Sequence, residues 1–365
     1  MKAPLDPASL IIVVGGGGVG KTTVAAALAL ASAQSGLDTL VMTFDPSMRL
    51  KDALGVGDAA RDHEVNVPVR TKGRLAASLL DAKATFDRLV RRYAPDDAVA
   101  TRILSNRFYA NLSGSLAGVL EYMAVERLFE VATEGRYDRV ILDTPPTRQA
   151  IDFLEAPSRI VGFLESGAVR IALRPWFDDQ GHLRGIRRLG MLGRSVEHWF
   201  DRVVGLGLLR DMAEFFLSFG PMYEGFRQRA QAVNGLLTAP GTSFILVTRP
   251  DQEHVPETLF FARKLVENGH HLGPLVVNMR HPEPGETRPP RGIPPEAAAV
   301  MTWLGERDAR GLQAYRDVMP GQRVVDLPLF PDEPTALDAL ERLADTLVDQ
   351  LAGRTPPEPV PAGRR

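Results

Sequence analysis

The segment Leu10-Ile-Ile-Val-Val-Gly-Gly-Gly-Gly-Val-Gly-Lys-Thr-Thr23 says more about this chain than any other part of it. A short apolar run leads into glycines, and from Gly15 the chain reads Gly-x4-Gly-Lys-Thr, the pattern of a phosphate-binding loop. Glycine lets the backbone close around a polyphosphate with its N–H groups pointing inward. An alanine-rich stretch of high helix propensity follows. The sequence therefore predicts a strand, a phosphate loop and a helix whose positive N-terminal end faces the same anion.

The loop residues are expected to divide the work of holding a nucleotide. Those predicted to bind it are Gly15, Gly16, Gly17, Gly18, Val19, Gly20, Lys21, Thr22 and Thr23. Lys21 is expected to reach the β- and γ-phosphates and serve catalysis, and the Thr22 hydroxyl to ligate Mg²⁺. A glycine turn without a ligand is the alternative. The apolar run before it argues against that alternative, because it has the continuous hydrophobicity of a buried parallel strand.

The composition excludes several classes of function. The chain has 365 residues, with 43 basic and 45 acidic side chains, so it lacks the field that attracts nucleic acid or anionic lipid. It has no apolar run of about 18 residues and no apolar leader, so we expect a cytoplasmic protein without a transmembrane segment. The absence of cysteine excludes disulfides, thiolate metal sites and cysteine nucleophiles. His270-His271 is more typical of a solvated turn than of a metal site.

Apolar runs of strand length recur along the chain, each followed by a helical pattern. After the first run they lie at 39–44, 139–142, 243–248, 275–278 and 323–327. This alternation predicts an α/β fold, a mostly parallel sheet with helices on both faces. Ligands in such sheets bind at the carboxyl ends of the strands.

Two long stretches between the strands, about 74–134 and 150–238, are predicted to be mainly helical insertions in one domain that spans 1–351. A proline-rich loop at 281–295 and a tail at 352–365 are expected to be disordered. Residues 196–226 are rich in Met and Phe. That pattern is typical both of an apolar groove for a client helix and of the core of a helical layer.

Two acidic residues follow strands and are therefore expected beside the phosphate loop. Asp45 opens Asp-Pro-Ser-Met-Arg-Leu50, where a carboxylate would orient the attacking water and contribute to the metal site. A helix N-cap is the alternative for Asp45. Asp143 ends a strand and is expected to hold Mg²⁺ directly or through water, with a strand-end cap as the alternative.

The order of these motifs resembles that of the ArsA-type ATPases, which include arsenite-pump ATPases and the targeting ATPases of tail-anchored membrane proteins. They belong with MinD and ParA in the deviant-Walker group. Residues 45–54 resemble the switch I of this family, and residues 137–154, with Asp-Thr-Pro-Pro-Thr, resemble its switch II. The similarity runs in order over about 9–350 and is greatest to a bacterial ArsA-like branch. It implies ATP and Mg²⁺ as cofactors.

The resemblance also implies where the adenine base would bind. Residues 247–251 with Glu257-Thr258, then 276–278, resemble the base-binding segments, and 327–334 resembles the adenine loop. The residues implied are Asp251, Asn278, Pro328, Leu329, Phe330 and Pro331. Asn278 would form a hydrogen bond with adenine. A strand-end asparagine that caps a turn is the alternative.

The chain departs from the family pattern at three points. Gly16 stands where the family has a signature lysine that reaches across a dimer to the partner's phosphates, which implies slow self-paired hydrolysis. Pro145 and Arg148 replace the usual alanine and glycine of switch II. Arg148 is either a substitute cation or a solvated surface residue. The missing cysteines remove the arsenite site and the zinc clasp, so an arsenite-pump subunit is not expected.

We therefore expect an ArsA-like ATPase that binds and slowly hydrolyses Mg-ATP, and so switches conformation to gate a protein partner or client on its helical layer. It would act as a homodimer or as a heterodimer with a paralogue. The alternative is an ATP-binding module without hydrolysis, in a heteromer whose paralogue supplies the missing lysine. A DNA-partitioning factor is disfavoured by the balanced charge, and no nucleic acid partner is expected.

Overall fold

The computed structural model of the chain describes residues 7–43, 49–56, 60, 63–110, 119–145, 147–165, 211, 214–215, 218–219, 222–283, 294–330 and 337–353. The chain divides into two compact units. The first comprises Met1–Leu80, Glu130–Ile151 and Leu237–Arg365, and the second comprises Asp81–Phe129 and Asp152–Leu236. The second unit lies inside the two stretches that the sequence marks as insertions.

The first unit is built on a sheet that has eight strands in the described part of the chain. They are β1 (Leu10–Gly15), β2 (Thr39–Thr43), β3 (Val65–Asn66), β4 (Leu75–Leu79), β5 (Arg139–Asp143), β6 (Thr242–Thr248), β7 (Leu272–Arg280) and β8 (Val324–Pro328). Their order is β3-β4-β2-β5-β1-β6-β7-β8, and every neighbouring pair is parallel except β3 and β4. The predicted mostly parallel α/β sheet is confirmed.

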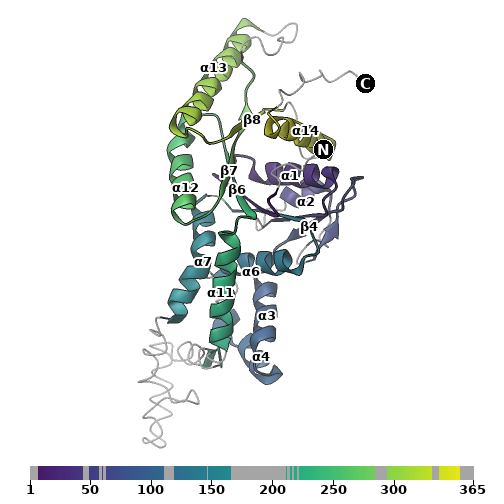
Figure 1. The fold of residues 1–365 in the computed structure, drawn as a ribbon, viewed down its shortest axis with the longest axis vertical. Helices are drawn as coiled ribbons and strands as arrows, with labels where there is room; N and C mark the ends of the chain where they lie inside the picture. Colours follow the sequence, from purple (N-terminus) through teal and green to yellow (C-terminus); the bar gives the residue numbers. More distant parts are fainter. Residues whose placement is uncertain are drawn as a thin grey trace, which may run out of the picture. The chain divides into compact units, whose positions relative to one another are not determined.

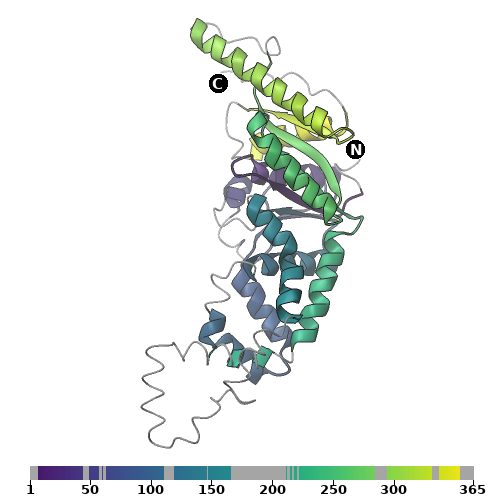
Figure 2. The ribbon, with the colours of Figure 1, turned by 90° about the vertical axis from the view of Figure 1, so that its left-hand side faces the viewer.

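Helices cover both faces of this sheet (Figure 1). The helices α1 (Lys21–Ser35), α2 (Arg49–Leu54) and α14 (Leu337–Leu351) lie on one face, and α12 (Val255–Glu267) and α13 (Pro295–Val318) lie on the other. Figure 2 shows α12 and α13 from their own side of the strands. Because α1 lies between the sheet and α14, most of its residues are buried, and its many alanines allow that close packing.

Six strands form where the sequence predicts them, but β3 and β4 were not predicted. β4 reads Leu-Ala-Ala-Ser-Leu, and all five residues are buried. Its small residues have no strand propensity of their own, so its position beside β2 decides its conformation. β3 has only two residues and pairs with β4 in the antiparallel direction. These two strands form one edge of the sheet.

The second unit is helical in its described part. It contains α3 (Ala82–Tyr93), α4 (Asp97–Leu104), most of α6 (Val119–Glu134) and α7 (Thr147–Glu165), and α11 (Tyr223–Leu237). Its core is rich in aromatic side chains: Phe215, Phe219 and Phe226 are buried among residues of α3 and the chain after α4. Within the 196–226 stretch, Phe215, Phe219, Met222 and Phe226 are therefore core in this conformation. Its first part, 196–210, lies outside the described residues.

An ion pair is also buried in this unit. The Arg229 Nε donates to Glu126 Oε1 over 2.5 Å, and Glu126 is fully buried. The Tyr122 hydroxyl donates to the other Glu126 oxygen at 3.3 Å. A buried carboxylate without a partner would be costly, and this pair gives Glu126 a partner while it links α6 to α11.

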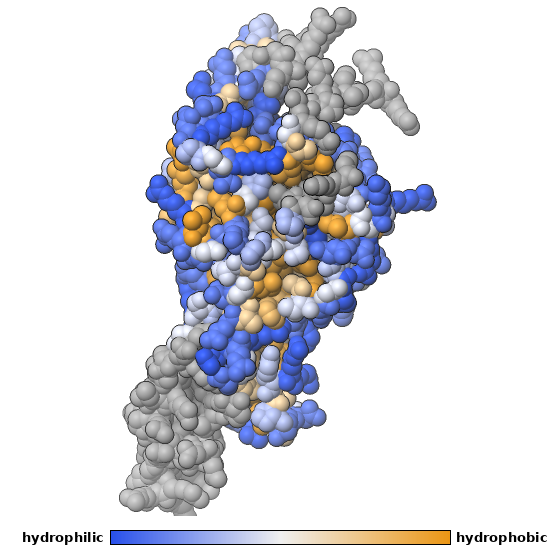
Figure 3. Space-filling model, viewed as in Figure 1, coloured by the Kyte–Doolittle hydropathy of each residue, from blue (hydrophilic) through white to orange (hydrophobic). Residues whose placement is uncertain are grey.

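The surface is mainly hydrophilic on the face drawn in Figure 3, with apolar residues in separate patches. Large apolar side chains that are exposed include Phe260 and Val266 of α12 and Val300, Met301 and Trp303 of α13. Within the described ranges, no helix is long and apolar enough to cross a membrane. Several predicted features lie outside those ranges: Asp45, Pro331, most of the 281–295 loop and the tail from 354 onward.

The expectation of a solvated turn at His270-His271 is wrong for His270, which is 6% exposed. Its Nδ1 lies 3.2 Å from the Leu237 carbonyl oxygen, and its ring packs against Phe244 with the centroids 4.8 Å apart. Burial lowers the pKa of the His270 imidazole and outweighs the hydrogen bond to Leu237, which acts to raise it. Among the described residues, no cluster of three His, Asp or Glu side chains could hold a metal ion.

The buried His270 predicts that stability falls on the acid side of neutrality. Because its pKa is lower in the folded state than the ordinary 6.5, the unfolded chain binds the proton more tightly. The contribution of His270 is therefore complete above about pH 6.5 and is lost as pH falls below that value toward the folded-state pKa. We expect His270→Gln to reduce the dependence of the free energy of unfolding on pH between pH 7 and 5, as measured by urea titrations. The matched His271→Gln, at an exposed position, should keep the wild-type slope; equal slopes for all three proteins would contradict the assignment.

Candidate functional site

The glycine loop begins at the end of β1, which lies between β5 and β6 in the middle of the sheet. Two of its glycines make contacts that no other residue could make. A Cβ on Gly15, whose φ is +154°, would lie 2.1 Å from the Val247 carbonyl oxygen. A Cβ on Gly20, whose φ is +90°, would lie 2.2 Å from the Asn278 Nδ2. The loop is therefore held closely against the ends of β6 and β7.

The middle of the loop is open. A Cβ on Gly17 or Gly18 would meet no atom within 4 Å. Lys21, the first residue of α1, is only 8% exposed, and its Nζ donates to the Gly16 carbonyl oxygen at 2.7 Å. The loop thus has a cation at its base and space above its central glycines, which is the arrangement that a polyphosphate requires.

A carboxylate oxygen of Asp143 accepts hydrogen bonds from two hydroxyl groups next to the loop. Asp143 Oδ2 accepts hydrogen bonds from the Thr22 hydroxyl at 2.7 Å and from the Thr43 hydroxyl at 3.0 Å. The sheet register sets Asp143 beside both Val13 and Thr43, because β5 lies between β1 and β2. The structure therefore brings together Thr22 and Asp143, which the sequence assigns to one metal site.

The segment that resembles switch II is tied to β1 just after β5 ends. The Thr144 backbone N–H and hydroxyl both donate to the Val13 carbonyl oxygen, at 3.2 and 2.8 Å. This holds Asp143 and Thr144 at the strand end. The side chains of residues 146–149, Arg148 among them, lie outside the description, so the two alternatives for Arg148 remain open.

Asn278 lies beside the phosphate loop. Its Nδ2 donates to the Val19 carbonyl oxygen at 2.9 Å, and the residue is 5% exposed. Pro328 and Leu329 follow along the neighbouring strand, where the Leu329 N–H donates to the Arg280 carbonyl oxygen at 2.8 Å. Phe330 packs partly buried against the core. The binding of adenine by these residues stays a prediction.

Asp251 caps a short turn. It precedes the 3-10 helix η4 (Gln252–His254), and its carboxylate accepts from the His254 backbone N–H at 3.3 Å and lies 2.5 Å from His254 Nδ1. Burial acts to raise the pKa of Asp251, but the contacts with His254 outweigh it and lower that pKa. The charge of Asp251 is therefore directed at His254 in this conformation. A role toward the base stays a prediction.

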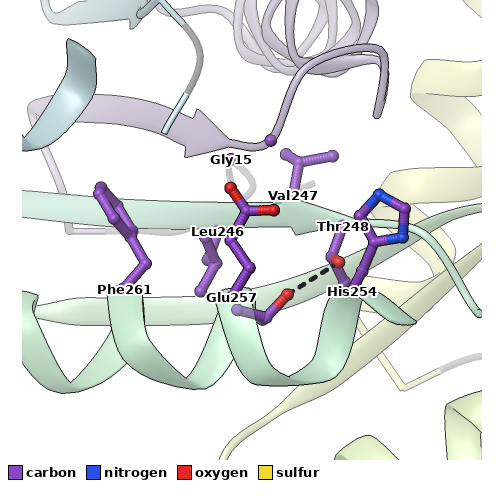
Figure 4. A pocket seen from close by; sticks show the side chains of 9 residues that line it. Gly15, Leu246, Val247, Thr248, His254, Glu257 and Phe261 are labelled. Carbon is purple, nitrogen blue, oxygen red and sulfur yellow. Dashed lines mark hydrogen bonds between the residues drawn. The ribbon is translucent and has the colours of Figure 1, made fainter. Parts of the chain in front are cut away.

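A small pocket opens next to the loop (Figure 4). It is lined by Gly15, Gly16, Leu246, Val247, Thr248, His254, Glu257, Thr258 and Phe261. Figure 4 shows the Glu257 carboxylate pointing from α12 toward the backbone of Gly15. Below it, the Thr248 hydroxyl lies 2.9 Å from the hydroxyls of both Thr258 and Tyr315. This buried network joins the end of β6 to α12 and α13.

The residues present fit Mg²⁺ with a nucleotide. The Thr22 hydroxyl and the Asp143 carboxylate are the hard oxygen ligands that this ion prefers, and they are already in contact. The space above Gly17 and Gly18 and the cation at Lys21 fit the phosphates.

Sequence reasoning missed some polar residues at the strand ends. Thr43 and Thr248 end β2 and β6 and are nearly fully buried. Thr43 was given no role, and Thr248 was included only in a segment that resembles a base-binding one. The sequence held one signal for them: several of the apolar runs end in a polar residue. Such residues meet at one edge of a parallel sheet.

The chain is similar in sequence to known ATPases. The sequence profile of a family described as anion-transporting ATPase matches residues 8–180. ATPase ASNA1 homolog 2 of Paramecium tetraurelia is 30% identical over 361 residues, which is 95% of this chain and 96% of that protein. Putative arsenical pump-driving ATPase 1 of Aquifex aeolicus is 23% identical over 96% of this chain and 80% of its own. ATPase GET3 of Kluyveromyces lactis is 31% identical over 51% of this chain and 55% of its own.

The open space above Gly17 yields a test of the loop. Gly17→Ala adds a methyl group that meets nothing in the protein, so the variant should keep its fold and its unfolding temperature. The methyl group would occupy the place of a phosphate, and we expect ATP affinity to fall by about ten- to a hundredfold, equivalent to the 1–3 kcal/mol that overpacking costs. Calorimetric titration measures this. Gly235→Ala, also at an open position but in α11, should bind ATP as the wild type does. A Gly17→Ala protein with unchanged affinity would place the phosphates elsewhere.

Proposed function

Because this chain belongs to the ArsA and GET3 type of ATPases, we propose that it hydrolyses Mg-ATP slowly and uses the cycle to switch conformation and gate a protein partner. The observation that carries the proposal is the contact of Thr22 and Asp143 beside an open phosphate loop with Lys21 at its base. We further propose that it works in the cytoplasm.

The residues of the site would take different parts in the reaction. Lys21 would leave the Gly16 carbonyl oxygen and turn to the β- and γ-phosphates, where its charge stabilises the transition state. When bound, Mg²⁺ would neutralise charge on the same phosphates, with Thr22 and Asp143 as its protein ligands. Asp45, two residues beyond the end of β2, would orient the attacking water and accept its proton.

The conformational switch would act through Asp143 and through α7, the helix that follows it. Asp143 joins α1, β2 and β5 through its two hydroxyl donors, so a metal that competes for Thr22 would change the contacts of all three elements. α7 begins four residues after Asp143 and continues from the first unit into the second. We propose that this helix carries the state of the site to the helical unit. Phe215, Phe219 and Phe226 are core in this conformation, so we do not assign the client surface to them.

Phosphate release from ATP tests the proposal. We expect release that requires Mg²⁺ and falls about a hundredfold or more in Asp45→Asn, the size of a lost general base, with ATP binding retained. Lys21→Ala should instead weaken ATP binding, by about ten- to a hundredfold for lost charge-assisted hydrogen bonds. Lys264→Ala, which removes an exposed lysine paired with Glu267, is the matched control and should behave as the wild type. The proposal fails if no Mg²⁺-dependent release occurs, or if Asp45→Asn releases phosphate at the wild-type rate.

Gly16 favours a second candidate, a heteromer in which this chain binds ATP and a lysine-bearing paralogue completes the site. Glycine supplies no charge, and a cation delivered by a partner can raise phosphoryl transfer about 10³-fold or more. We expect the paralogue to join this chain on gel filtration in Mg-ATP and to raise phosphate release. If the two proteins elute separately and the rate is unchanged, this candidate is rejected and hydrolysis belongs to the chain alone.

A further inference from the structure

We propose that Asn278 is a positioning residue of the phosphate loop, which holds the Val19–Gly20 peptide ready for the phosphates. The proposal rests on the proposed function, because it assumes that this loop binds the phosphates of a nucleotide. It assigns Asn278 to the phosphate end of that site, whereas the sequence assigns it to the base.

The contact of Asn278 with the loop is close on two sides. Its Nδ2 donates to the Val19 carbonyl oxygen at 2.9 Å. The same nitrogen lies so near Gly20 that a Cβ there would come within 2.2 Å of it. Because the C=O and N–H of a trans peptide point in opposite directions, fixing the Val19 carbonyl toward Asn278 turns the Gly20 N–H away from it. Asn278 thus sets the direction of one loop amide.

The amide also satisfies a carbonyl that lies away from water. Val19 is fully buried and Asn278 nearly so. A buried carbonyl oxygen without a donor is costly, and the loop would have to move to find another. Within the part of the chain that the structure describes, this is the hydrogen bond that the Asn278 side chain makes. Loss of the amide would therefore release the loop from its position against β7.

The end of β7 is shaped to present Asn278. Met279, the next residue, has φ +62°, a conformation that residues with a side chain rarely adopt. The pairing of β7 with β8 shifts register between Val277 and Arg280, so Asn278 and Met279 form an irregular step in the ladder. Such irregularities re-aim a side chain, and a strained backbone at one points to a function.

Firm contacts after this step hold it in place. The Arg280 Nε donates to Asp326 Oδ2 at 2.8 Å, which joins β7 to β8. The His281 N–H donates to Asp308 Oδ2 at 2.9 Å, which joins the chain to α13. Before the step, Val277 pairs with Thr248 of β6. The position of Asn278 is thus determined by three neighbouring elements, as a residue that positions others requires.

A comparison of ATP with inorganic tripolyphosphate separates the two roles, because tripolyphosphate has no base. We expect Asn278→Ala to weaken binding of Mg-ATP and of Mg-tripolyphosphate by the same factor, about tenfold for one buried hydrogen bond, as measured by calorimetry on the full chain. Asn278→Val, which suits a strand end and also lacks the donor, should give the same result if the alanine variant folds poorly. Unchanged tripolyphosphate affinity with weaker ATP binding would overturn the proposal in favour of base recognition. Unchanged affinity for both ligands would overturn it as well.

Asn106→Ala is the matched control. Asn106 is also buried, and its Nδ2 donates to the Asp211 carbonyl oxygen at 3.0 Å in the helical unit. This variant should lower thermal stability and leave tripolyphosphate binding unchanged. If it weakens tripolyphosphate as much as Asn278→Ala does, general destabilisation explains both and the proposal fails. If the wild type binds ATP but does not hydrolyse it, the proposed function is wrong, while the role of Asn278 is still decided by the binding measurements. If the wild type binds neither ATP nor tripolyphosphate, both proposals are wrong.

Discussion

The phosphate loop is held against the ends of β6 and β7 by contacts that leave no room for a β-carbon. At Gly15 the chain passes so close to the Val247 carbonyl oxygen that a methyl group would overlap it, and at Gly20 the Asn278 amide occupies that space. These contacts join β1 to two other strands at the point where the loop leaves the sheet. The rest of the site depends on them, because Lys21 and Thr22 follow Gly20 directly and take their positions from it.

Asp143 organises the other side of the loop. Two hydroxyls donate to one of its carboxylate oxygens, and each hydroxyl belongs to a different element, α1 or β2. The site is therefore built from the ends of β1, β2 and β5, which are widely separated in sequence. A ligand that competes for the Thr22 hydroxyl acts on an interaction that already links these elements.

The helical unit has a core of a different composition from that of the sheet. Its described core combines aliphatic side chains with aromatic rings that meet edge to face, stacked or tilted, and the pair of Arg229 and Glu126 lies in the same unit. The sequence left open whether the Phe-rich stretch is a groove or a core, because both need the same side chains. The burial of Phe215, Phe219 and Phe226 makes them core in this conformation. No property of the sequence alone could have made that distinction, since it depends on what packs against the rings.

The amino-acid sequence by itself determined the phosphate loop, six of the strands and the α/β class, because these depend on local patterns: glycine spacing, apolar runs and helix propensity. Only the tertiary structure decided that Leu75–Leu79 is a strand, since its small residues become extended by pairing with β2. It also decided that His270 is buried and that the Asn278 amide holds Val19. Each of these facts depends on a neighbour distant in the chain, and a local pattern carries no information about which distant residue will be adjacent.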